Sequence, residues 1–107
     1  MTSTPPAQEI AEALQQNEGT LRRLGVRSLA LFGSAARADL GPESDVDLLY
    51  EFEPEAATLT RLLDLQAFLE GVLGRDVDLV PRNHVSPILR RYIADDVVPV
   101  YGAFARL

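Results

Sequence analysis

The stretch Phe32-Gly33-Ser34-Ala35-Ala36-Arg37, followed after a short gap by Ser44-Asp45-Val46-Asp47-Leu48, predicts both the fold and the chemistry of this chain. A glycine turn that leads into a helix leaves backbone N–H groups unpaired, and such groups attract an anion. Two aspartates at positions i and i+2 of a strand point to the same face of a sheet. The stretch therefore predicts a phosphate-binding turn opposite two carboxylates that can bind Mg²⁺.

Length and composition predict a single domain that spans residues 1–107. A chain of 107 residues can bury one core but not two. The absence of cysteine excludes disulfides and thiolate metal sites. We recognise neither a membrane-spanning stretch nor a secretory signal, so we expect a cytoplasmic protein without a membrane partner.

The acidic residues gather around the aspartate motif. The net charge is −6, and residues 38–55 contain no basic residue but seven acidic ones, namely Asp39, Glu43, Asp45, Asp47, Glu51, Glu53 and Glu55. Such a cluster is typical of a cation site, although a solvated acidic loop has the same composition. It would also repel nucleic acid, so we expect no direct nucleic-acid partner.

Hydrophobic periodicity predicts helices that alternate with strands. We expect a helix from Pro5-Pro6 to Gly25 that Gly19 interrupts, and a brief helical turn at 34–38. An amphipathic helix around Leu62–Val72 should end at Gly74, with an apolar stripe formed by Leu62, Leu65, Leu69 and Val72. A last helix should begin at Ser86-Pro87, with one apolar stripe formed by Ile88, Leu89, Tyr92 and Ile93. We expect strands at 29–32, 45–52, 76–80 and 97–101, the last at a sheet edge because it contains Pro99. The strand at 45–52 should alternate, with Val46, Leu48, Tyr50 and Phe52 on one face and Asp45, Asp47, Leu49 and Glu51 on the other. This order predicts an α/β (α+β) fold in which helices pack on a mixed β-sheet.

A third carboxylate would complete a metal site at the two aspartates. Asp76 and Asp78 share a face of the expected strand, and either can supply this carboxylate; we favour Asp78 because hydrophobic residues flank it on both sides. Carboxylate oxygens without His or Cys favour Mg²⁺ or Mn²⁺ over Zn²⁺. Two such ions can clamp the attacking and leaving oxygens of a phosphoryl or nucleotidyl transfer.

These motifs resemble the DNA polymerase β-like nucleotidyltransferase superfamily. The shared pattern is Gly33-Ser34, ten residues, then Asp45-x-Asp47, with a later Val77-Asp78-Leu79-Val80. The small size is similar to that of the minimal nucleotidyltransferases, the MNT antitoxins that pair with HEPN ribonuclease toxins. The resemblance covers about residues 24–101. It implies a nucleotidyltransferase fold and transfer of AMP from ATP to a hydroxyl, which in MNT antitoxins belongs to a tyrosine of the toxin.

The resemblance also implies roles for individual residues. Asp45, Asp47 and Asp78 match the catalytic metal ligands, and Asp78 would lie near the attacking hydroxyl. The nucleotide-binding positions are matched by Gly33, Ser34, Arg37 and Ser44. One departure is Ala38, since the family often has glycine after the arginine.

Two other functions remain open at this stage. The chain can be a non-catalytic antitoxin that neutralises its partner by binding, or a small-molecule transferase that modifies an antibiotic. Among the remaining residues, we expect His84 at the surface, the pair Arg90-Arg91 on a solvated helix face, and Tyr50, Tyr92 and Tyr101 in core or half-buried positions.

Overall fold

The computed structural model describes residues 6–33, 36 and 45–103. Its helices are α1 (Pro6–Gln16), α2 (Glu18–Arg23), α3 (Leu59–Leu73) and α4 (Pro87–Ile93), with short 3₁₀ turns η1 (Pro54–Ala56) and η2 (Arg82–His84). Its strands are β1 (Val26–Phe32), β2 (Val46–Phe52), β3 (Val77–Pro81) and β4 (Val98–Gly102). The expected helical turn and loop at 34–42 lie outside the described residues, apart from Ala36.

The strands form one mixed sheet in the order β3-β2-β1-β4. β1 runs antiparallel to β2 and β4, whereas β3 runs parallel to β2. The mixed sheet is thus confirmed, and so is the edge position of the strand that contains Pro99. Because of these directions, the end of β1 and the beginnings of β2 and β3 meet at one end of the sheet.

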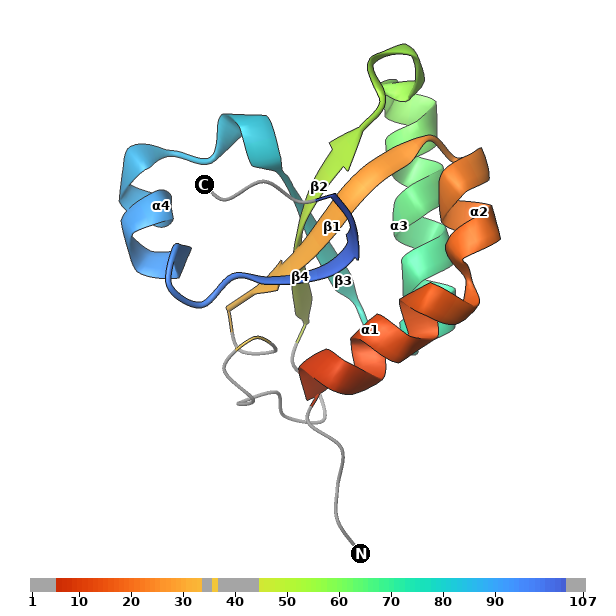
Figure 1. Ribbon diagram of the computed structural model, residues 1–107. Helices are drawn as coiled ribbons and strands as arrows, with labels where there is room; N and C mark the ends of the chain where they lie inside the picture. Colours follow the sequence, from red (N-terminus) through yellow and green to blue (C-terminus); the bar gives the residue numbers. More distant parts are fainter. Residues whose placement is uncertain (1–5, 34–35, 37–44, 104–107) are drawn as a thin grey trace, which may run out of the picture.

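The two faces of the sheet are covered differently (Figure 1). Helices α1, α2 and α3 lie on one side, and α4 lies on the other. The larger core lies under α1–α3, where Val46 and Leu48 of β2 pack with Leu14, Leu65 and Leu69. A smaller cluster lies under α4 and contains Phe32, Leu49, Val85 and Ile93. The expected alternation of β2 is confirmed, since its even-numbered residues enter the first core and Leu49 enters the second.

The expected interruption of the N-terminal helix at Gly19 is misplaced, because the helix breaks at Asn17 and Gly19 lies inside α2. The Asn17 side chain donates a hydrogen bond to the carbonyl of Ala13 (2.7 Å), and its backbone N–H donates to the carbonyl of Leu14 (3.0 Å). An Asn side chain competes for backbone groups in this way and favours turns over helix interiors. The apolar spacing continues across the break, which is why periodicity alone did not reveal it.

Helix α3 is capped at both ends. Thr58 accepts a hydrogen bond from the backbone N–H of Arg61 (3.2 Å), and Gly74 ends the helix in the left-handed conformation at φ +67°. Leu65 and Leu69 are fully buried. The predicted apolar stripe and the predicted glycine cap are both confirmed.

Helix α4 begins as predicted, but its apolar residues do not form one stripe. Ser86 accepts a hydrogen bond from the N–H of Leu89 (3.1 Å), and Pro87 occupies the first turn. Leu89 and Ile93 pack under the helix. Ile88 and Tyr92 are instead 71% and 77% exposed. The expectation that Tyr92 is at least half-buried is therefore wrong.

Candidate active site

Gly33 follows directly after β1 and lies against Asp47 of β2. Its φ of +71° lies in the left-handed region that favours glycine. A Cβ atom at this position would overlap with Oδ2 of Asp47. The turn thus requires glycine for its backbone conformation and for the close approach of the Asp47 carboxylate.

Asp47 lies opposite Asp78 on the neighbouring parallel strand. The register pairs Val46 with Val77, Asp47 with Asp78 and Leu48 with Leu79. Paired residues of adjacent strands project from the same face, and the strands lie about 4.8 Å apart. On its other side Asp47 is paired with Phe32 of β1, next to Gly33. Gly33, Asp47 and Asp78 are therefore brought together at one end of the sheet.

Asp45 and Asp76 precede their strands by one residue, and both are exposed, as Asp78 is. The carbonyl of Asp76 accepts a hydrogen bond from the N–H of Val46 (2.9 Å), which places Asp76 outside the ladder position that faces Asp47. Of the two candidates for a third carboxylate, it is Asp78 that the register pairs with Asp47. The roles of Asp45, Asp47 and Asp78 stay predictions.

Helix α3 holds the beginning of β3 in place. Glu70 Oε2 accepts a hydrogen bond from the N–H of Val77 (3.0 Å), and Gln66 Nε2 donates one to the carbonyl of Val77 (3.2 Å). Both backbone groups belong to the residue directly before Asp78. Sequence analysis missed Gln66 and Glu70, because on the sequence they look like the polar side of an amphipathic helix.

The donor set has the chemistry that Mg²⁺ requires. All three aspartates offer carboxylate oxygens, and Mg²⁺ is usually held by one or two protein carboxylates, water and substrate phosphate. Within residues 6–33, 36 and 45–103, no group of three or more His, Cys, Asp or Glu side chains is arranged so that it could hold a metal ion. The strand register pairs Asp47 with Asp78, and Asp45 precedes Asp47 by two residues. Ser34, Arg37 and Ser44, the other predicted nucleotide-binding residues, lie outside the described residues.

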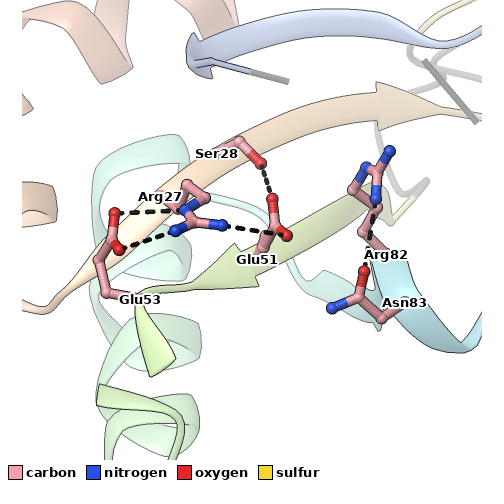
Figure 2. A network of polar contacts seen from close by, with 6 residues as sticks. All are labelled: Arg27, Ser28, Glu51, Glu53, Arg82 and Asn83. Atoms are coloured by element: carbon pink, nitrogen blue, oxygen red, sulfur yellow. Dashed lines mark hydrogen bonds and ion pairs between the residues drawn. The ribbon is translucent and has the colours of Figure 1, made fainter. Parts of the chain in front are cut away.

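A separate polar network lies at the other end of the same sheet face (Figure 2). Arg27 donates hydrogen bonds to both carboxylate oxygens of Glu53, at 3.4 and 3.2 Å, and lies 3.8 Å from Oε2 of Glu51. These carboxylates raise the pKa of the Arg27 guanidinium, mainly through the hydrogen bonds and charge of Glu53. The buried Ser28 hydroxyl donates to Glu51 Oε1 at 3.4 Å. Glu51 is thus part of a structural network, although it follows Asp47 on the same face of β2.

Comparison with known proteins agrees with this architecture. A family described as "Nucleotidyltransferase domain" matches residues 7–100. Protein adenylyltransferase MntA of Thermococcus cleftensis is 36% identical over 94 residues, which make up 87% of this chain and 94% of that protein. A solved structure assigned to the minimal nucleotidyltransferases is 31% identical with a TM-score of 0.70, and the match covers 92% of this chain and 99% of the solved one.

A more distant match is found in the solved complex of a tri-AMPylated Shewanella oneidensis HEPN toxin with an MNT antitoxin. One chain of that complex is 22% identical with a TM-score of 0.53, and the match covers 83% of this chain and 72% of that one. At this identity the match shows the fold alone.

In the part of the chain that the structure describes, no helix is long and apolar enough to span a bilayer.

The expected resemblance is confirmed by the family match and by relatives that align over almost their whole length. This chain belongs to the nucleotidyltransferase domain family and is a nucleotidyltransferase.

Proposed function

We propose that this chain is a magnesium-dependent protein adenylyltransferase that transfers AMP from ATP to a tyrosine of a HEPN-type toxin and thereby acts as its antitoxin. The observation that carries the proposal is the pairing of Asp47 with Asp78 beside the Gly33 turn. The identity to an MntA protein adenylyltransferase supports the same activity. A fold shared with one chain of a HEPN toxin–MNT antitoxin complex fits the proposed partner.

The proposed reaction needs only one bond formed and one bond broken at phosphorus. The tyrosine oxygen forms a bond to the α-phosphorus of ATP while the bond from that phosphorus to the bridging oxygen of the β-phosphate breaks. Pyrophosphate leaves, and the hydroxyl proton passes to a carboxylate, for which Asp78 is our candidate.

Asp45 and Asp47 would hold Mg²⁺, which neutralises charge on the phosphate oxygens and orients them when it is bound. The remaining task of the chain is to position the phosphates. Backbone N–H groups of a glycine turn are suited to this, and in our proposal Ser34, Ser44 and Arg37 add hydroxyl and guanidinium donors.

The test is transfer of labelled AMP from ATP to purified HEPN-type protein from the same genome. We expect one or more AMP groups on a tyrosine, dependence on Mg²⁺ or Mn²⁺, and loss of labelling in the double variant Asp45→Asn/Asp47→Asn. Equal labelling by that variant would contradict the proposal. Neutralisation of the toxin in cells by the same variant, without labelling, would show that the chain acts by masking its partner.

A further inference from the structure

A patch on α4 combines exposed apolar side chains with an arginine, and the proposed function leaves it unused. The α4 patch consists of Ile88, Arg91 and Tyr92. Ile88 and Tyr92 are separated by four residues and Ile88 and Arg91 by three, so all three lie on neighbouring positions of the helix surface. Ile88 is 71% and Tyr92 77% exposed, and Arg91 is exposed as well. Burial of Leu89 and Ile93 on the opposite side holds the patch outward.

Helix α4 itself is basic, although the net charge of the chain is −6. It contains Arg90 and Arg91 and no acidic residue, and Asp95 and Asp96 follow in the turn after it. A surface that combines Ile and Tyr with Arg has the composition of a protein-binding hot spot, because aromatic residues and Arg are enriched there. Its charge complements an acidic surface.

The α4 patch also lies on the relevant side of the molecule. Phe32 and Leu49 pack under α4, and Phe32 is paired with Asp47, so α4 covers the face of the sheet from which Asp47 and Asp78 project. Helices α1, α2 and α3 lie on the other side (Figure 1). A molecule that docks on α4 is therefore on the same side as the candidate active site.

We infer that the α4 patch is the docking surface for the protein acceptor, and that the matching surface of the acceptor is an apolar groove lined by acidic side chains. This inference rests on the proposed function, since it names the surface that recruits the tyrosine-bearing partner. A second copy of this chain fits less well, because a symmetric contact through so short a helix brings the Arg91 side chains of both copies close together. Nucleic acid fits less well because Ile88 offers nothing to a phosphate backbone.

The chain offers matched controls on the opposite side of the sheet. Leu59 and Leu63 of α3 are also four residues apart and are 70% and 57% exposed. Arg22 and Arg23 form a pair of adjacent, exposed arginines in the last turn of α2, as Arg90 and Arg91 do in α4. A nonspecific effect of a new charge on a helix surface should be the same at both places.

The experiment measures the Kd between this chain and purified HEPN-type protein from the same genome, together with the Kd for Mg-ATP. We expect Ile88→Asp and Tyr92→Asp to raise the protein Kd at least about tenfold, and Arg91→Glu to raise it severalfold and to weaken its salt dependence. Leu63→Asp and Arg23→Glu should change it less than about twofold. Mg-ATP binding should stay unchanged in all five variants.

The outcomes separate this inference from the proposed function. Equal effects of the α3 and α4 variants, or no binding of the unaltered chain to any HEPN-type protein of that genome, would overturn the α4 docking surface. Binding that depends on α4 but is never followed by AMP transfer would leave the docking surface standing and contradict the proposed function. Transfer of AMP at full rate by Ile88→Asp would contradict the docking surface and leave the proposed function standing.

Discussion

Gly33 and Asp47 lie so close together that no side chain fits between the Cα of the glycine and the carboxylate of the aspartate. The relationship joins the end of β1 to the beginning of β2, two points that are fourteen positions apart in the sequence. It holds the turn that precedes the expected phosphate-binding residues against a candidate metal ligand. The missing side chain of Gly33 thus allows the glycine turn and the Asp47 carboxylate, the two parts of the proposed active site, to lie next to each other.

Gly33→Ala should therefore lose activity beyond its effect on stability. The new Cβ would overlap Asp47 Oδ2 and force that carboxylate away, while the left-handed backbone adds a cost of about 1–2 kcal/mol. Gly74→Ala is the matched control, because its φ of +67° is nearly the same but nothing lies within 4 Å of a Cβ there. We expect similar losses in thermal stability and a loss of AMP transfer in Gly33→Ala alone. Equal activity of the two variants would contradict the steric argument.

Asp78→Asn should slow transfer far more than Asp76→Asn. The register pairs Asp78 with Asp47, whereas Asp76 lies before the strand begins. Removal of a charge-stabilising group or a proton acceptor typically costs about 10²-fold or more in rate. The measurement is the initial rate of AMP transfer at saturating ATP. If Asp76→Asn were the slower enzyme, the third carboxylate would be Asp76.

Glu70→Ala should lower the rate of AMP transfer, although Glu70 is not one of the candidate site residues. Its carboxylate accepts the hydrogen bond of the Val77 N–H, and loss of that bond leaves the beginning of β3 less well held, at a cost of about 1 kcal/mol. We expect a lower transfer rate with little change in the affinity for Mg-ATP. Glu70→Gln keeps an acceptor oxygen and should restore most of the rate. Failure of Gln to restore it would indicate that the charge of Glu70, and not its hydrogen bond, matters.

Tyr50 should make the folded state less stable at alkaline pH. Burial raises the pKa of the Tyr50 hydroxyl above its ordinary value, while the unfolded chain releases this proton near pH 10. Below that pH Tyr50 is neutral in both states, so its ionisation does not change the free energy of unfolding. Above it the unfolded state ionises first, so the free energy of unfolding falls as the pH rises towards the pKa of the folded state.

Urea unfolding at pH 8 and at pH 10.5–11 would measure this fall, and Tyr50→Phe should reduce it. Phe keeps the ring that packs edge-on against Phe52, with the two ring centroids 5.5 Å apart, so the two proteins should differ little at pH 8. An identical fall in both proteins would show that other groups cause the alkaline loss.

The sequence by itself determined the features that depend on local spacing. The alternation of β2, the glycine cap of α3 and the Ser86-Pro87 start of α4 follow from periods and capping preferences that act over a few residues, and the structure agrees with each. The family resemblance rested on Gly33-Ser34 and Asp45-x-Asp47, which lie close together in the chain. It was confirmed by the comparisons.

Only the tertiary structure decided which distant residues meet. Asp78 and not Asp76 faces Asp47 because the parallel register of β2 and β3 is set across the intervening helix α3, partly through Glu70 and Gln66. Ile88 and Tyr92 are exposed because α4 can bury only one side against the sheet, and the sequence contains two apolar pairs at the same spacing. Strand pairing and the choice of the buried helix side are long-range packing outcomes, which local patterns restrict but do not settle.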